Sequence, residues 1–151
     1  MPGHDAVIIT ASSTTLRGFK DNPRYFSAGT RPVIDAMKAH SVRRLVVLSA
    51  LGVGDSLPLL NVLLRTLMVS FILKYPYADH EVQEAMVRES GLDWVIARPG
   101  RLTNGPARRR YVKTAALEKV PSSIARADVA DFLVDAATLD AWVGKAVQLG
   151  G

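Results

Sequence analysis

The stretch Arg44-Leu45-Val46-Val47-Leu48-Ser49 decides the fold, because it is a short apolar run that ends in a hydroxyl residue. Two similar apolar runs lie before and after it in the sequence, at residues 6–9 and 93–97. Runs of this length without polar alternation are typical of strands buried on both faces of a parallel sheet. Helical spacing between the runs predicts an α/β fold, in which helices cover both faces of a parallel sheet.

Three segments between and after these runs carry the signals of helices. We expect Thr30 to be the N-cap of the first helix, with Pro32 in its first turn. We expect Asp79 to cap the second helix, residues 127–139 to form the third, and residues 146–149 to form a last strand. The side chains predicted to face inward are Val33, Ile34 and Met37 in the first helix, Val82, Ala85 and Met86 in the second, and Val129, Leu133, Ala136 and Ala137 in the third.

The composition fits a single domain over residues 1–151. Of these residues 48% are apolar, which is too many for a disordered chain and enough for a core at this length. The chain has no cysteine, which excludes disulfide scaffolds, zinc fingers, iron–sulfur clusters and thiol catalysis. A chain without cysteine fits a reducing compartment, and the first residues show no signal peptide, so we expect a cytoplasmic protein.

The longest apolar stretch covers residues 57–73. A membrane-spanning helix needs about 20 apolar residues with few or no charges. This stretch is shorter and carries Asn61 and Arg65 on one face, so we do not expect an integral membrane protein. We interpret it as a buried helix or a lid over a site, and a helix lying on a membrane surface is the alternative.

The formal net charge of +5 raises the question of nucleic-acid binding. The positive residues gather in Arg43-Arg44 and in a run between Arg98 and Lys113. A nucleic-acid binder usually adds a recognised module or aromatic residues between the charges, and only Tyr111 lies in this run. We therefore interpret the run as a solvated basic loop and expect no nucleic-acid partner.

Several motifs of known chemistry are incomplete. Residues 52–57 follow a strand as a G-x-G-x-x-G turn does, but Leu57 replaces the third glycine, so we interpret the segment as a flexible loop. Residues 80–84 resemble the zinc motif H-E-x-x-H, but Glu84 replaces the second histidine and no third ligand is evident, so we expect no metal. No tyrosine precedes a lysine by four residues, and G-x-S-x-G does not occur, which argues against a Tyr–Lys acid pair and an esterase.

Polar residues follow each of the three predicted strands. They are Thr10-Ala11-Ser12, then Ser49-Ala50, then Arg98-Pro99-Gly100. In open α/β sheets, ligands bind outside the carboxyl ends of the strands, so converging hydroxyl groups and one cation predict a site for a polar ligand there. The alternative is that serine and threonine only form turns and caps at these positions.

Longer blocks of the sequence resemble a known family. They are Gly3-His-Asp-Ala-Val-Ile8, Ala36-Met-Lys-Ala39, Arg43-Arg-Leu-Val-Val-Leu-Ser-Ala-Leu-Gly52, a block from Val87 to Pro106 that contains Ser90-Gly-Leu-Asp-Trp-Val-Ile-Ala-Arg-Pro99, and Ile124-Ala-Arg-Ala-Asp-Val-Ala130. In this order, along nearly the whole chain, they are similar to the NmrA-like, NAD(P)H-binding group of atypical short-chain dehydrogenases. Reductases of biliverdin and of flavin belong to that group.

The resemblance implies a Rossmann fold that binds NADP or NAD, with NADP preferred, and that reduces a small flat conjugated substrate such as flavin, quinone or tetrapyrrole. A non-catalytic redox-sensing or regulatory module is the alternative within the group. Ser49 and His80 would be catalytic residues that hydrogen-bond the substrate or help to supply a proton, and the alternative for His80 is a hydrogen bond within its own helix. Asp128 would open the helix beneath the site. By position, the cofactor-binding residues would be Thr10, Ala11, Ser12, Ser49, Ala50, Arg98, Pro99, Gly100 and Arg101.

The chain departs from this family at its start. Family members begin with strand and helix units that carry the pyrophosphate-binding glycines and the residue that chooses between NAD and NADP. The resemblance therefore implies that residues 1–151 are the C-terminal portion of the fold, without the N-terminal β-α-β units, and that this chain binds its cofactor poorly. Residues 7–9 would then lie at an exposed sheet edge, through which an inactive remnant would self-associate.

Overall fold

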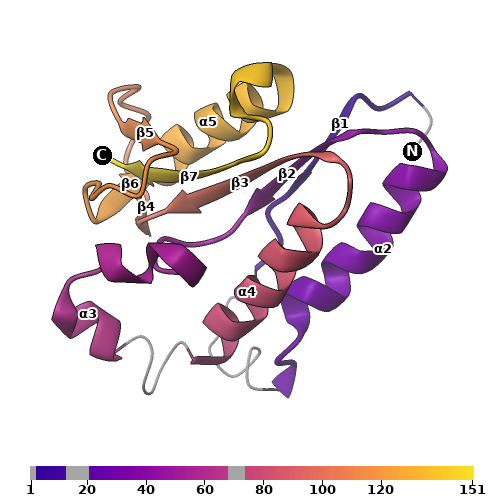
Figure 1. Cartoon of the computed structure of the whole chain (residues 1–151). Coiled ribbons are helices and arrows are strands. Elements are labelled where there is room, and N and C mark those ends of the chain that lie inside the picture. Colours follow the sequence, from indigo (N-terminus) through magenta and orange to yellow (C-terminus); the bar gives the residue numbers. More distant parts are fainter. Residues whose placement is uncertain (1–2, 13–20, 68–73) are drawn as a thin grey trace.

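The computed structural model describes residues 3–12, 21–67 and 74–151 (Figure 1). Its main sheet has five strands, and all are parallel except the last, which is antiparallel to its neighbour. The predicted α/β fold is confirmed, and the sheet, predicted to be parallel, has one antiparallel strand at its edge. In spatial order the strands are β1 (Ala6–Ile9), β2 (Arg44–Leu48), β3 (Asp93–Pro99), β7 (Lys145–Gly150) and β5 (Val112–Thr114).

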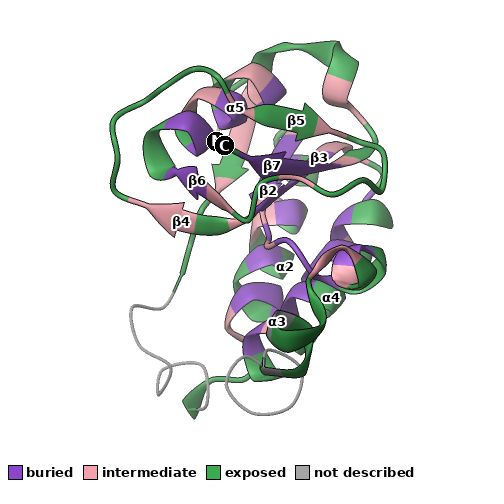
Figure 2. Ribbon diagram, turned by 90° about the vertical axis from the view of Figure 1, so that its left-hand side faces the viewer, coloured by how far each residue is buried: buried purple, intermediate pink, exposed green. Residues whose placement is uncertain are grey.

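Helices cover both faces of this sheet, as predicted. In Figure 1, α2 (Tyr25–Ala39) and α4 (Lys74–Arg88) lie on one side, and α5 (Arg126–Thr138) lies on the other. Successive residues of a strand point to opposite faces, so the strands contribute to two cores. Figure 2 shows buried residues on the strands and on the helix faces turned to them. The strand residues in the core with α2 and α4 are Leu45, Val47 and Ile96, and those in the core with α5 are Val46, Val95, Ala97, Val147 and Leu149.

Strand β1 lies at the edge of the sheet. Within the described residues it pairs only with β2, from Ala6 opposite Arg44 to Ile9 opposite Val47. The predicted position at a sheet edge is therefore confirmed, but the predicted burial on both faces is wrong. Ile8 is 38% exposed and the rest of the strand is only half-buried, because a strand with a single partner leaves one side uncovered.

The start of α2 differs from the prediction. Thr30 lies inside the helix and is not its N-cap, and Pro32 is also internal. The second and third backbone N–H groups of the helix, those of Phe26 and Ser27, donate to the Asp79 carboxylate at 2.6 Å and 3.3 Å. The unpaired donors at the start of a helix need such an acceptor. Here it comes from α4, far away in the sequence, and local signals cannot reveal it.

The buried face of α4 is largely polar, which corrects two predictions. Asp79 does not cap α4, because the helix already begins at Lys74. The prediction of an inward side chain is wrong for Val82 and Ala85, which are exposed, whereas Met86 is half-buried and packs against the core. Apolar spacing misled the prediction because each inward polar residue of α4 has a hydrogen-bond partner. The buried residues of this helix are Pro76, Asp79, His80, Gln83, Glu84 and Val87.

The segment that follows β2 is an ordered turn and not the flexible loop expected for residues 52–57. Gly52 and Gly54 adopt φ angles of +96° and +55°, which favour glycine. The Gly52 N–H donates to the Ser56 hydroxyl at 2.9 Å, and the 3-10 helix η1 spans Gly54–Leu59. Local hydrogen bonds therefore order this turn.

The apolar stretch 57–73 does not form one buried helix. After η1 the chain forms the short helix α3 (Val62–Leu67), in which Val62 and Leu63 are 79% and 71% exposed. The last part of the stretch, residues 68–73, lies outside the described residues. In the part of the chain that the structure describes, no helix is both long and apolar enough to cross a membrane.

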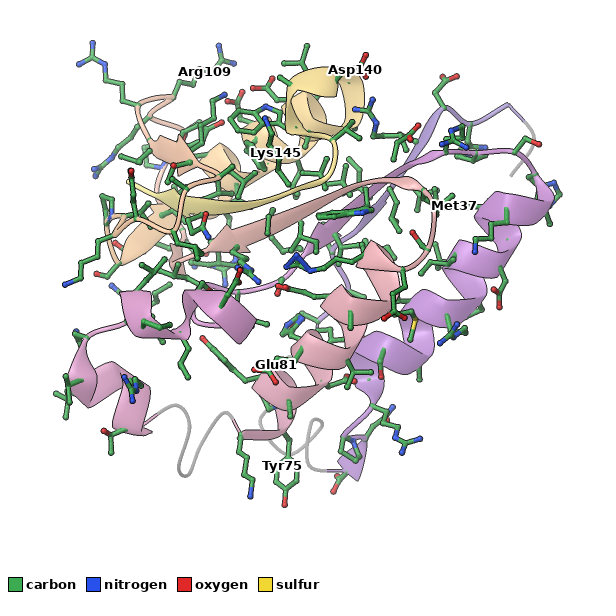
Figure 3. All side chains as sticks on the ribbon, in the orientation of Figure 1. Met37, Tyr75, Glu81, Arg109, Asp140 and Lys145 are labelled. Carbon is green, nitrogen blue, oxygen red and sulfur yellow. The ribbon has the colours of Figure 1, made fainter. Side chains whose placement is uncertain are left out.

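The expected basic loop after β3 contains a second, small sheet. Its strands are β4 (Arg101–Thr103) and β6 (Ser123–Ala125), which are parallel. Arg109 remains exposed and points outward in Figure 3. Arg98 does not belong to a solvated run, because its side chain is 1% exposed. A last 3-10 helix, η3 (Asp140–Trp142), joins α5 to β7.

Candidate functional site

A pocket of about 500 Å³ lies at the carboxyl ends of β1 and β2. Ligands of open α/β sheets bind in this position, because the loops that leave the strands there form a crevice. Residues from α2, α4 and α5 complete its walls. The lining residues are Thr10, Ala11, Ser12, Phe26, Leu48, Ser49, Ala50, Pro76, Tyr77, His80, Leu102, Arg126, Val129, Ala130 and Leu133.

Most of the residues predicted for the site meet in this pocket. Residues 10–12 follow β1, Ser49 and Ala50 follow β2, and His80 approaches from α4. The described part of the stretch 57–73, expected to be a lid, contributes nothing to the lining. Neither do the remaining predicted cofactor-binding residues, which are Arg98, Pro99, Gly100 and Arg101.

Most of the pocket lining is apolar, and we call this pocket the apolar slot. The rings of Phe26 and His80 stack with their centroids 3.8 Å apart and their planes at 20°. Val129 and Leu133, both buried, come from α5 on the other face of the sheet. Residues 10–12 are exposed and form part of the rim. Such a slot suits a planar ring that gains free energy from apolar burial and is oriented by a few polar groups.

Ser49 is held by a buried carboxylate. Its Oγ donates to Oε1 of Glu84 at 2.7 Å, and both residues are buried. Glu84 also accepts from Arg98, at 2.9 Å from Nε and 2.6 Å from Nη2, and from Arg88 at 3.0 Å. Arg98 in turn pairs with Asp55 of η1. We call Ser49, Glu84, Arg98 and Asp55 the charged network.

Arg98 serves this network rather than the pocket lining. Burial by itself lowers the pKa of Arg98, but the hydrogen bonds and charges of Glu84 and Asp55 outweigh burial and raise it. Gly100 allows a close contact between two backbone segments, because a Cβ at this position would lie 2.7 Å from the carbonyl oxygen of Ser122. Arg101 is exposed in β4.

His80 is held by uncharged partners. Its Nδ1 lies 2.9 Å from Oε1 of Gln83, and Nε2 of Gln83 donates to the Thr30 hydroxyl at 2.8 Å. The Thr30 hydroxyl donates to the Phe26 carbonyl oxygen at 2.8 Å. We call His80, Gln83, Thr30 and this carbonyl group the neutral network. Burial lowers the pKa of His80, although the hydrogen bond of Gln83 and the charges of Glu84 and Asp79 oppose this.

Sequence reasoning missed the partners that hold both site residues. Glu84 was considered only as an incomplete zinc motif, and Gln83 and Thr30 were assigned no role in the site. A signal was present, because residues 79, 80, 83, 84 and 87 share one face of a helix. Because four of these five residues are polar, the pattern favoured a solvent-exposed face.

One further carboxylate, that of Asp128, bears on the site. Asp128, which was expected to open the helix beneath the site, lies buried in the first turn of α5. It accepts from the backbone N–H groups of Arg108 and Arg109 at 2.9 Å and 2.8 Å, which ties the basic loop to a helix of the pocket. The Glu84 carboxylate already accepts from Ser49, Arg98 and Arg88. In residues 3–12, 21–67 and 74–151, no three His, Asp or Glu side chains gather as a metal site would require.

Solved structures share this architecture. The chain is 26% identical to chuY from E. coli CFT073, with a TM-score of 0.71 over 83% of this chain and 66% of that one. It is 24% identical to ChuY, an anaerobillin reductase from E. coli O157:H7, with a TM-score of 0.72 over 95% and 62%. A short-chain dehydrogenase/reductase from Veillonella parvula, solved with NADP, is 18% identical, with a TM-score of 0.71 over 82% and 58%. The chain thus spans less than two thirds of each of these proteins.

The family follows from the sequence as a whole. No curated protein matches the chain. A family model described as NAD(P)H-binding matches residues 1–140, and these residues include all the strands of the sheet except β7, together with every pocket residue. The chain therefore belongs to the NAD(P)H-binding family.

Proposed function

We propose that the chain forms the nicotinamide and substrate side of an NAD(P)H-dependent oxidoreductase that reduces a small, flat, conjugated molecule such as flavin, quinone or tetrapyrrole. One observation carries the proposal: an apolar slot at the carboxyl edge of the parallel sheet has Ser49 and His80 in its wall. Its volume of about 500 Å³ lies within the usual range for small-molecule sites. We place the protein in the cytoplasm because the chain has no cysteine.

The pocket residues fit a nicotinamide and a planar substrate in contact. NAD(P)H, when bound, supplies a hydride. Residues 10–12 and Ala50 would border the cofactor, and the stacked ring of His80 and the apolar side chains of α5 would hold the substrate and exclude water. Ser49 would orient one of the two rings by a hydrogen bond. NADP is the preferred cofactor, which the family resemblance and the NADP complex of the Veillonella protein support.

Titration with NADPH tests this function. We expect weak binding by the chain, followed by the increase in NADPH fluorescence. Ala130→Trp should abolish it, because Ala130 is an exposed residue of α5 that lines the pocket, and a large ring there would fill the slot. Ala127→Trp is the matched control, since Ala127 is exposed on the same helix outside the pocket.

The outcomes separate the alternatives. Equal binding of NADPH by both tryptophan variants would overturn the proposed site. If NADPH binds in the pocket but is not oxidised in the presence of flavin, quinone or biliverdin, the non-catalytic redox-sensing module replaces the reductase. Tight binding by the unmodified chain would contradict only the expectation that its affinity is impaired.

Self-association through the β1 edge is a second proposed property. The observation in its favour is that β1 pairs only with β2 in the described residues and that Ile8 is 38% exposed. An edge strand with unpaired backbone groups is a template for another copy. Sedimentation velocity should show dimers or larger species that Ile8→Lys disperses, and a monomeric unmodified chain would refute the idea.

A further inference from the structure

Three polar side chains of the pocket wall, those of Ser49, Tyr77 and His80, share a direction of hydrogen bonding. Ser49 donates its only hydroxyl proton to Glu84, and Glu84 is paired with Arg98, so this carboxylate has no proton to return. Tyr77 donates its proton to the Leu51 carbonyl oxygen at 2.9 Å. Both hydroxyl groups therefore offer only lone pairs to a ligand in the pocket.

The neutral network fixes the direction at His80 in the same way. The Thr30 proton goes to the Phe26 carbonyl oxygen, so the Thr30 oxygen can only accept from the Gln83 amide nitrogen. The Gln83 amide oxygen then faces His80, and Nδ1 of His80 must carry the proton that it accepts. A neutral imidazole has one proton, which leaves Nε2 with a lone pair. Within the described residues Nε2 has no hydrogen-bond partner, and His80 lines the pocket.

We infer that the pocket selects its ligand by N–H donors: the substrate is a flat conjugated heterocycle with a lactam, imide or pyrrole N–H that meets the lone pairs of Ser49 Oγ and His80 Nε2. This inference rests on the proposed function and narrows its substrate class. A quinone, whose carbonyl groups only accept, finds no matching donor at Ser49, Tyr77 or His80. The other polar side chains of the lining, those of Thr10, Ser12 and Arg126, are exposed.

Glu84 and Gln83 are positioning residues in this scheme, because each acts on the ligand through another side chain. Glu84 turns the Ser49 proton away from the pocket, and Gln83 sets the tautomer of His80. Gln83→Glu should reverse the second effect. A carboxylate beside Nδ1 favours the imidazolium form, in which Nε2 becomes a donor. Ala85→Glu adds the same charge on the exposed side of the same helix and is the matched control.

A pair of ring compounds tests the ligand preference. Lumiflavin carries an imide N–H, and 3-methyllumiflavin is the same ring with that donor blocked. Binding to the full chain is followed by quenching of flavin fluorescence. We expect lumiflavin to bind about ten-fold more tightly, the value of one hydrogen bond. Gln83→Glu and Ser49→Ala should each reduce this preference, and Ala85→Glu should keep it.

The tautomer of His80 is measured independently of any ligand, by two-bond ¹H–¹⁵N correlation spectra of the imidazole. The Nδ1–H form in the unmodified chain and in Ala85→Glu, with a shift toward imidazolium in Gln83→Glu, supports the inference. The Nε2–H form overturns it, and so does equal binding of the two flavins. If neither flavin binds, the proposed reductase pocket fails, and the spectra still decide the direction of hydrogen bonding.

Discussion

Two buried networks start from the same face of α4 and reach the same pocket, but only one of them is charged. The charged network fixes Ser49 through Glu84 and Arg98, which are both almost fully buried. The neutral network fixes His80 through amide and hydroxyl groups alone. The comparison separates two ways of orienting a site residue in an apolar surrounding.

The difference lies in the cost of a missing partner. A buried ion without its partner is strongly unfavourable, whereas a buried neutral group without its partner loses about one hydrogen bond and its desolvation energy. The charged network therefore anchors the end of β3 to α4 and tolerates little change. The neutral network sets a proton position and allows change at a lower cost.

Arg98→Met should have the largest effect, because it leaves the buried Glu84 carboxylate with the Ser49 hydroxyl and the half-exposed Arg88 but without its buried cation. We expect the free energy of unfolding to fall by about 3–5 kcal/mol in urea denaturation followed by circular dichroism. Arg88→Met is the control, since the Arg88 side chain is 36% exposed and its pair with Glu84 should be worth less than about 1 kcal/mol. Equal losses in the two variants would remove the contrast between the networks.

Thr30→Val should have a smaller effect, because it removes a neutral partner of the same size. It leaves Nε2 of Gln83 without an acceptor, which should cost about 1–3 kcal/mol in the same denaturation experiment. Thr138→Val is the control. The Thr138 hydroxyl also donates to a helix carbonyl oxygen, that of Val134, but Thr138 is exposed, so the free energy of unfolding should change by about zero. A cost for Thr30→Val as large as that for Arg98→Met would show that charge is not the deciding factor.

The fold could be predicted because its signals are local. The apolar runs around Val46 and Val95 and the apolar face of α5 each lie within one element, and all three were placed correctly. The sheet edge at β1 came from the family resemblance and is confirmed. The predictions that were wrong concern features that depend on distant partners, such as the cap of α2 by Asp79 and the inward polar face of α4.

The site was predicted in part for the same reason. Residues at the ends of β1 and β2 must meet wherever parallel strands are adjacent, so Ser49 and residues 10–12 could be brought together from topology alone. The burial of Arg98 could not, because a long cation in a basic run is usually solvated. Its partners Glu84 and Asp55 come from separate elements, and only the folded chain brings them together.

Acidification should produce the smallest effect, and it acts on the neutral network while Arg98 stays charged. Burial lowers the pKa of His80 below its ordinary value of 6.5, against the charges of Asp79 and Glu84, and Arg126 is the cation that lines the same pocket. In the unfolded chain the imidazole therefore takes up its proton first as the pH falls.

The stability that depends on neutral His80 is complete above about pH 6.5 and is lost as the pH falls from there toward the folded-state pKa. Between about pH 8 and about pH 5.5, the free energy of unfolding measured by urea denaturation should fall less for His80→Asn than for the unmodified chain. His40→Asn, at the exposed end of α2, is the control. If His80→Asn leaves the pH dependence unchanged, the imidazole is not held neutral by burial, and the two networks do not differ in their response to protons.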